Sequence, residues 1–363
     1  MPPMRAPRLA PALLCLLAAG ALLGGCGGDS DTDSTAAAAY QPAPSRPAPA
    51  KSSFPAPEGR TLRQVLKAAD ARSELVVRPA AEVFYRGENR YPFGVYDRDK
   101  GEIPDAEVAL YLAKVPAPKP GAKSKSGNRG QLAKAQEQAL DQPARGPFPA
   151  AIESLATKPA FRGKTTTGDP EAATVVYSVD LELPSKGEWR LAALIKEDGE
   201  LKGALLPGAA VVGEFKKIPE PGERAPAIHT PTAQDVGGDL SKITTRVPPD
   251  TQNKVDYAAA LGKEPIVLLF ATPEFCQSRV CGPVVDVAEQ AKQEYGDEAA
   301  FIHMEIYNEN DPAKRVRPQV RAFHLPTEPY LFTIDREGIV RDAVEGPFGI
   351  PLMHQAVKEA IAR

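Results

Sequence analysis

Two cysteines, five positions apart, are the residues of this 363-residue chain whose type and spacing best suit chemistry. Cys276 and Cys281 lie in the stretch FATPEFCQSRVCGPVVD, and the other two cysteines, Cys15 and Cys26, lie within the first thirty residues. A thiol pair can exchange a disulfide with another molecule, bind a soft metal ion, or close a structural loop. The elements that hold the pair decide among these possibilities.

The pair is predicted to lie between a strand and a helix. The apolar run Ile266–Phe270 precedes it and is typical of a buried strand, and Val284–Tyr295 follows it with a helix-compatible pattern. At the N-terminus of a helix, backbone N–H groups and the helix dipole lower the pKa of a thiol. This position therefore favours a reactive cysteine.

The spacing of the two cysteines predicts that they do not share one regular helix. Residues i and i+5 of a helix are turned about 140° apart and lie about 8 Å apart, beyond the reach of a disulfide. Pro283 is tolerated only in the first helical turn, so the helix should begin near Gly282. Cys281 would then occupy the helix N-terminus and Cys276 the preceding loop. Either cysteine could be the attacking thiol.

The N-terminus predicts export. Arg5 and Arg8 precede the apolar run Leu9–Leu23, which is too short to span a membrane and ends in small residues, as a signal peptide does. The closing LGGC resembles the lipobox of bacterial lipoproteins, which implies that residues 1–26 are a lipoprotein signal and that Cys26 is lipidated. A plain signal peptide is the alternative. The protein is therefore expected to be extracytoplasmic and lipid-anchored to the cell membrane, where the remaining thiol pair would tend to form a disulfide.

The composition predicts two domains and long connections. The formal charge of −3 is near neutral, so no nucleic-acid partner is expected, and 38 prolines indicate extended linkers. Residues 27–59 are rich in Ala, Pro and Ser and nearly lack large apolar side chains, which predicts a disordered tether. Thr61–Arg72 is predicted to form a short helix.

Residues 74–215 are predicted to form an antiparallel β-sandwich. Runs such as Val175–Leu183 and Trp189–Ile195 alternate apolar and polar residues, with turn residues between the runs. A strand is also expected at Glu82–Tyr85. This architecture resembles the immunoglobulin-like domains of secreted bacterial proteins. Residues 116–147 interrupt the pattern with a basic, Pro- and Gln-rich sequence and are expected to be a flexible insertion without secondary structure.

Residues 216–363 predict an α/β domain, because strands alternate with helices before a closing hairpin and a final helix. The predicted helices are 253–261, 284–295, 313–323 and 350–362, and the predicted strands are 266–270, 300–307, 330–335 and 339–344. The cysteine pair thus follows the first strand of this domain.

Three segments of the same region resemble the thioredoxin-like superfamily, in its extracytoplasmic thiol–disulfide oxidoreductase branch. Gly222–Pro226 resembles the G-x-x-A-P entry of that branch, and FATPEFC resembles its strand-to-active-site run, with Phe275 as the aromatic residue before the first cysteine. Pro329–Gly338 resembles the P-T-x-F-x-I-D-x-x-G segment, which implies that Pro329 is cis and faces the cysteines. The resemblance implies a substrate groove at Phe275 and Glu328, with backbone groups free to pair with a substrate chain. The C-x4-C spacing departs from the C-x-x-C of the family.

These features predict a thiol–disulfide oxidoreductase without a cofactor, acting on protein thiols or disulfides through Cys276, Cys281 and Pro329. The main alternative is a non-enzymatic interaction module in which the pair forms only a structural disulfide.

Two further alternatives fit less well. A peroxiredoxin requires a threonine three residues before its peroxidatic cysteine, where this chain has Pro273, and an arginine near the last strand, where it has Pro329. A copper-binding chaperone would need a histidine ligand, and His324 has the wrong spacing for that family.

Overall fold

The computed structural model describes residues 43–99, 101–117 and 127–363. These residues belong to one compact unit. The predicted signal peptide, Cys26 and the first part of the predicted tether lie outside the described residues. Within the described ranges, no helix has the length and hydrophobicity needed to cross a bilayer.

Two sheets in the N-terminal part of the described chain enclose one hydrophobic core. The first sheet has the order β1 (Ala71–Arg72), β9 (Glu200–Leu205), β8 (Gly187–Glu197), β4 (Glu107–Lys114) and β5 (Arg145–Pro149), and β10 (Ala210–Val212) also pairs with β8. The second has the order β2 (Val76–Pro79), β3 (Gly87–Tyr96), β7 (Val175–Leu183) and β6 (Ala151–Ser154). All strand pairs in both sheets are antiparallel except β1 with β9.

The alternation in the sequence explains this layering, because one face of each strand is apolar and points into the shared core. Tyr177 and Leu181 of β7 are buried there, as is Trp189 of β8, whose indole N–H donates to the carbonyl of Ser185 at 3.0 Å. The two layers of strands agree with the predicted alternation, while an immunoglobulin-like identity stays a prediction. Glu82–Tyr85 does not form a strand and contributes only an isolated bridge at Phe84.

The described residues of two segments expected to be irregular include ordered parts. Within the predicted tether, Phe54 is buried against the first sheet and Arg46 forms a bridge with Ile152. Within the predicted insertion, Gly127–Ala139 forms helix α2, so the expectation that the insertion lacks secondary structure is wrong for this part. The helix predicted over Thr61–Arg72 is confirmed only for α1 (Leu62–Lys67), which Thr61 caps in a capping box with Gln64, and Ala71–Arg72 forms the strand β1 instead.

The C-terminal part contains a four-stranded sheet with the order β12 (Ala300–Met304), β11 (Ile266–Phe270), β13 (Tyr330–Ile334) and β14 (Val340–Glu345). The pair β11–β12 is parallel, and the pairs β11–β13 and β13–β14 are antiparallel. Every residue of β11 is buried, as its five consecutive apolar residues predict. The predicted order of strands along this part of the chain is confirmed.

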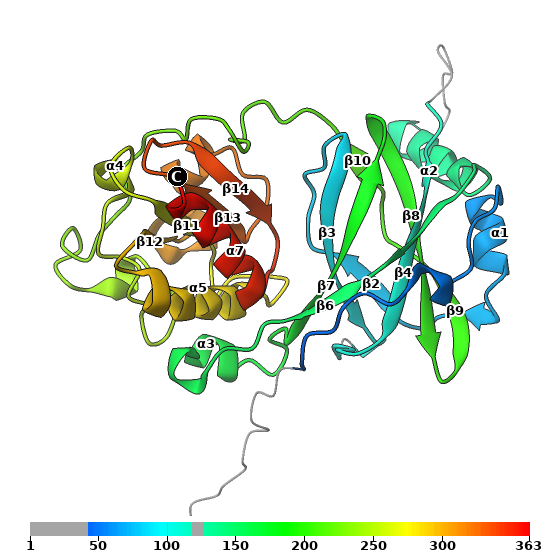
Figure 1. Ribbon diagram of the computed structural model, residues 1–363, viewed down its shortest axis with the longest axis horizontal. Coiled ribbons are helices and arrows are strands. Elements are labelled where there is room, and N and C mark those ends of the chain that lie inside the picture. Colours follow the sequence, from blue (N-terminus) through cyan, green and yellow to red (C-terminus); the bar gives the residue numbers. More distant parts are fainter. Residues whose placement is uncertain (1–42, 100, 118–126) are drawn as a thin grey trace, which may run out of the picture. The chain divides into compact units, whose positions relative to one another are not determined.

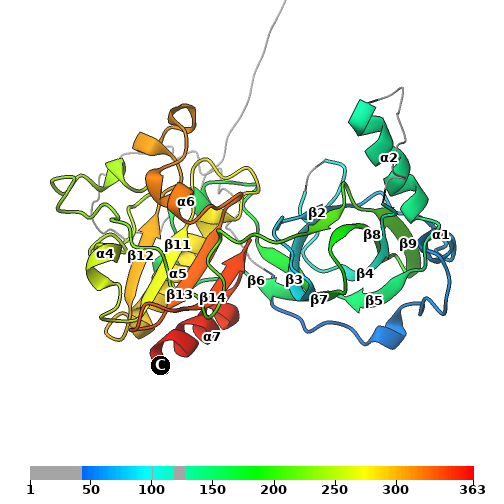
Figure 2. The ribbon, with the colours of Figure 1, turned by 90° about the horizontal axis from the view of Figure 1, so that it is seen from above.

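Helices cover both faces of this sheet (Figure 1). Helices α5 (Cys281–Tyr295) and α7 (Ile350–Ile361) pack against one face, and α4 (Tyr257–Ala260) and α6 (Pro318–Ala322) against the other (Figure 2). The remaining helices of the described residues are α3 (Lys164–Thr167) and the short 3-10 helices Lys51–Ser53, Pro159–Phe161, Leu240–Lys242, Asn308–Asn310 and Pro312–Lys314.

A connection between two strands of the second sheet reaches the cysteine region. We call residues 155–174, which link β6 to β7, the covering segment. Leu155 and Ala173 of this segment belong to the same buried cluster as Cys276 and Cys281. The cysteine region is therefore enclosed by chain from outside its own sheet.

Candidate active site

The two cysteines lie where the strand β11 leads into the helix α5. Cys276 is in the loop that follows the strand, and Cys281 is the first residue of the helix, one position before the predicted start. The prediction that Cys276 and Cys281 do not share one helix is confirmed. Cys276 is 5% exposed and Cys281 is 0% exposed, and both carry free thiols in this structure.

Cys276 is surrounded by hydrogen-bond donors. Its Sγ accepts the backbone N–H of Cys281 at 3.3 Å and lies 3.4 Å from the hydroxyl of Ser278. The hydrogen bond from the Cys281 thiol is the largest influence on the Cys276 thiol, and together these donors outweigh burial and lower the pKa of Cys276 to about 6. At neutral pH Cys276 is therefore mainly a thiolate.

Cys281, in contrast, is held as a neutral thiol. Its complete burial, together with the hydrogen bond to Cys276 and the negative charge there, raises the pKa of the Cys281 thiol well above its usual range. A thiolate attacks a disulfide and a neutral thiol does not. Of the two thiols, that of Cys276 therefore has the properties of a nucleophile, while that of Cys281 stays protonated.

The predicted groove residues lie beside this pair. The Glu328–Pro329 peptide is cis, as the resemblance implied, and Tyr330 pairs with Phe270, the last residue of β11. Burial, followed by the negative charges of Cys276 and Glu305, raises the pKa of Glu328 to about 7. The carbonyl of Pro329 accepts the N–H of Gly346 at 2.9 Å, so that carbonyl is already paired.

The aromatic residue before Cys276 has a partner of its own. The ring of Phe275 contacts the ring of Tyr307 edge to face, with 6.3 Å between their centroids. Phe275 is half-buried, whereas Pro329 is buried. The side chain of Phe275 is therefore partly accessible next to Cys276.

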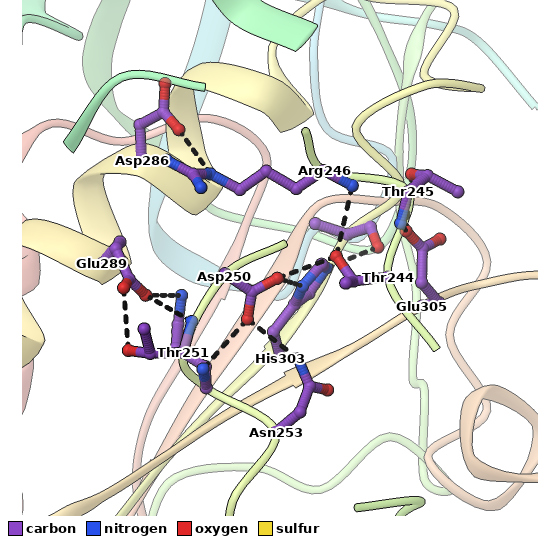
Figure 3. A network of polar contacts seen from close by, with 12 residues as sticks. Thr244, Thr245, Arg246, Asp250, Thr251, Asn253, Asp286, Glu289, His303 and Glu305 are labelled. Carbon is purple, nitrogen blue, oxygen red and sulfur yellow. Dashed lines mark hydrogen bonds and ion pairs between the residues drawn. The ribbon is translucent and has the colours of Figure 1, made fainter. Parts of the chain in front are cut away.

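A buried ionic network fixes the start of the cysteine loop (Figure 3). His303 contacts the carbonyl of Ala271 at 3.1 Å through Nε2 and the carboxylate of Asp250 at 2.8 Å through Nδ1. Burial lowers the pKa of His303, but the charge and hydrogen bond of Asp250 outweigh it and raise the pKa to about 9. His303 is therefore an imidazolium that holds the end of β11 in place.

A second part of this network holds the loop closer to Cys276. Glu305 is fully buried, and one of its carboxylate oxygens accepts both the N–H of Thr245, at 2.7 Å, and its hydroxyl, at 2.6 Å. The Thr245 hydroxyl in turn accepts the N–H of Glu274 at 3.2 Å. Two residues before Cys276, the backbone is thus tied to a buried carboxylate.

The covering segment is attached to α5 by a buried ion pair. Arg246 donates to Asp286 of the helix at 2.8 Å and to the carbonyl of Phe161 at 2.7 Å (Figure 3). The N–H of Gly163 donates to both oxygens of the Asp286 carboxylate at 3.1 Å. A deeply buried ion pair needs additional hydrogen bonds to offset the cost of its desolvation. Here Phe161 and Gly163 of the covering segment supply such hydrogen bonds, and the segment is thereby attached to the helix.

The covering segment also contacts the cysteine loop itself. Arg279, between the two cysteines, forms ion pairs with Asp169 at 3.1 Å and Glu171 at 3.6 Å. The carbonyl of Arg279 accepts the N–H of Ala173 at 3.1 Å. The charge of Arg279 is therefore already balanced by acidic residues of the covering segment.

Sequence reasoning missed several of these residues. No local pattern marks Glu305 or the covering segment as neighbours of the cysteine loop, because their contacts join residues far apart in the chain. Ser278 lies between the two cysteines, and the sequence analysis overlooked its hydroxyl as a hydrogen-bond partner of Cys276. His303 shows no ligand motif in the sequence, and the structure gives it an electrostatic role instead.

The structure also bears on the two lesser alternatives. Across the described ranges, no three His, Cys, Asp or Glu side chains gather as metal ligands. His324, its candidate ligand, lies on the surface. Thr272 and Pro273 are buried at the start of the loop, before the attacking cysteine.

The comparisons with known proteins give partial likenesses. The sequence matches no protein-family model and no curated protein. Among solved structures, the chain is similar to a thiol:disulfide interchange protein of the thioredoxin family from Chlorobium tepidum, with 19% identity and a TM-score of 0.28, over 39% of this chain and 97% of that chain. It is also similar to FdeC, an adhesin of Escherichia coli, with 12% identity and a TM-score of 0.18, over 43% of this chain and 39% of that chain.

Proposed function

We propose that this protein is a thiol–disulfide oxidoreductase that works through Cys276 and Cys281 on a thioredoxin-like fold. The observation that supports this most is the unequal ionisation of the two thiols. The pKa of Cys276 is lowered to about 6, within the range of reactive cysteines, whereas that of Cys281 is raised. Cysteines that only staple a structure need no such difference.

The reaction proceeds in two exchanges. The Cys276 thiolate attacks one sulfur of a substrate disulfide, forms a mixed disulfide and releases the other substrate sulfur as a thiolate. Cys281 then loses its proton and attacks the Cys276 sulfur, so that the Cys276–Cys281 disulfide forms and the second substrate thiolate leaves. The two electrons that reduce the substrate come from the cysteine pair. The reverse sequence oxidises a substrate dithiol.

The substrates in this proposal are proteins outside the cytoplasm. The signal and lipobox of the sequence support export and anchoring through Cys26, and an immunoglobulin-like sandwich would accompany the redox part. No cofactor is needed, because the cysteines themselves carry the electrons.

The reduction potential of the pair tests the proposal. The protein is equilibrated in graded thiol/disulfide buffers and acid-quenched, and its free thiols are counted by alkylation and mass. A potential between about −270 and −120 mV is that of known thiol exchangers and supports the enzyme. A potential below about −300 mV is that of a structural disulfide and would overturn it. Cys276→Ser and Cys281→Ser are the matched controls, since neither can form the internal disulfide.

A non-enzymatic module with a structural disulfide is the second candidate. The near-complete burial of both sulfurs favours it, because a buried disulfide is protected from exchange. This candidate predicts the lower potential in the same experiment. Replacement of either cysteine would then reduce stability without removing an activity.

A further inference from the structure

A cavity of about 440 Å³ lies against the cysteine loop. Gln277–Val280, between the two cysteines, forms one wall. The strands β2 and β3 of the second sheet form another with Arg78 and Tyr96, and Glu171 of the covering segment lines it as well. The loop that carries the thiols therefore shares a cavity with a sheet outside its own.

Tyr96 connects this cavity to the attacking thiol. Burial raises the pKa of Tyr96, and the negative charges of Glu102 and Cys276 add to that effect while Arg78 opposes it. A Cβ on Gly94 would lie 2.5 Å from an atom of the Tyr96 ring, so the absence of a side chain at Gly94 makes room for the ring. An aromatic side chain thus fits beside the loop and within electrostatic range of Cys276.

The two arginines that line the cavity differ in whether they are paired with carboxylates. Arg279 is paired with Asp169 and Glu171, as described above. Arg78 is exposed and lies over the Tyr96 ring, 5.2 Å from its centroid. In the described part of the chain, Arg78 forms no ion pair with a carboxylate. The cavity therefore offers one unneutralised cation to a ligand.

The other lining residues suit a polypeptide. Val176 and Pro347 add buried apolar residues to the lining, while the side chain of Phe93 points into the core between the two N-terminal sheets. The lining also contains the ion pair of Arg279 with Glu171, so Arg78 is the unpaired cation among the described residues that form it. A lining of this kind suits a short segment of chain that has an acidic residue next to an apolar one.

We propose that this cavity binds the residues that flank the cysteine of a polypeptide substrate, and that Arg78 selects a carboxylate among them. The inference rests on the proposed thiol exchange and assigns to the second sheet the recognition of that substrate. Arg78 would form a charge-assisted hydrogen bond with the carboxylate, and Tyr96 would hold the guanidinium in position.

Exchange rates with matched peptides test this inference. The reduced full chain is mixed with a blocked peptide whose single cysteine is disulfide-linked to 2-mercaptoethanol and flanked by glutamates, or with the same peptide flanked by glutamines. Bis(2-hydroxyethyl) disulfide serves as a neutral small substrate. Rates are measured by mass spectrometry of acid-quenched samples, and each is divided by the rate of the same disulfide with dithiothreitol.

The wild type should react about threefold to tenfold faster with the glutamate peptide. Arg78→Gln should remove this preference and Arg78→Glu should reverse it, with rates on the neutral disulfide unchanged. Arg72→Gln, at another exposed arginine that lies outside this cavity, should behave as the wild type. If Arg78→Gln keeps the preference, or slows all three substrates equally, the subsite is overturned while thiol exchange stands. If the wild type fails to react even with the neutral disulfide, the proposed function itself is overturned.

Discussion

At Cys276, a hydrogen bond from the Cys281 thiol is the largest of the influences that lower the thiol pKa. The same hydrogen bond helps to raise the pKa of Cys281. One contact thus shifts the pKa values of the two thiols in opposite directions. The low pKa of Cys276 therefore depends more on its contact with Cys281 than on the N-terminus of the helix, which the sequence analysis gave as the cause.

Replacing Cys281 with alanine should therefore raise the pKa of Cys276. A hydrogen bond to a charged group contributes about 1.5–3 kcal/mol, which corresponds to an upward shift of about one to two pH units from the wild-type midpoint. Thiolate absorbance near 240 nm, followed against pH, measures the midpoint, and Cys276→Ala gives the blank. A midpoint that stays near 6 in Cys281→Ala would show that the backbone donors and Ser278 are sufficient.

At the scale of the elements, the ionised His303 joins the end of β11 to the chain around Asp250. The pKa of His303 is about 9 in the folded protein, above the ordinary value near 6.5 expected on unfolding. The folded protein therefore holds this proton more tightly than the unfolded chain does. The stabilisation is fully present below about pH 6.5 and is lost as the pH rises through about 9.

The difference in unfolding free energy between the wild type and His303→Gln should accordingly shrink as the pH rises from about 6.5 to about 9, by about 1–3 kcal/mol. Urea denaturation at several pH values measures the unfolding free energy of each protein. Groups that titrate equally in both proteins cancel when the two free energies are subtracted. A difference that stays constant over this pH range would mean that His303 is neutral.

How far the sequence predicts these elements depends on whether their causes are local. The strand Ile266–Phe270 was predicted with its observed bounds because a run of five consecutive apolar residues is typical of a fully buried strand. Pro283 located the start of the helix to within one residue. Both signals lie within a few residues of the structure that they determine.

The covering segment could not be predicted in this way. Its attachment depends on Arg246 and Asp286, which are forty residues apart in sequence and bind backbone atoms of Phe161 and Gly163. The burial of Phe54 was likewise not predicted, because a single aromatic residue in an Ala- and Pro-rich stretch does not create a periodic pattern of apolar residues. The thiol pair was thus identified from the sequence, while the groups that surround it were not.

At the scale of the whole molecule, the strand that ends beside the thiol site also contacts the connection between β2 and β3. The carboxylate of Glu345 accepts the N–H groups of Glu82, at 2.9 Å, and Val83, at 2.8 Å. Next in the chain, Gly346 has φ +80°, and a Cβ there would lie 2.4 Å from the carbonyl oxygen of Ala80. Any side chain at Gly346 would therefore strain both parts of the compact unit.

Gly346→Ala should destabilise the protein by about 2–4 kcal/mol, because the positive φ and the clash with backbone both cost free energy. Gly208→Ala, at φ +70° with open space around it, is the matched control and should cost only about 1 kcal/mol. Trp189 is the single tryptophan of the chain and is buried between the two N-terminal sheets, so its fluorescence in urea reports the unfolding of that region. The alkylation of Cys276 and Cys281 reports the unfolding of the thiol site in the same samples.

If the described chain unfolds as one unit, both probes should shift together in Gly346→Ala, to the same lower urea midpoint. Thiols that become reactive at a lower urea concentration than Trp189 responds would contradict this and would show that the cysteine region opens by itself. The distinction bears on function, because Cys276 and Cys281 are almost completely enclosed. In a cooperative unit, a substrate must reach Cys276 with the covering segment in place, and the cavity lined by Arg78 and Tyr96 is then available to guide it.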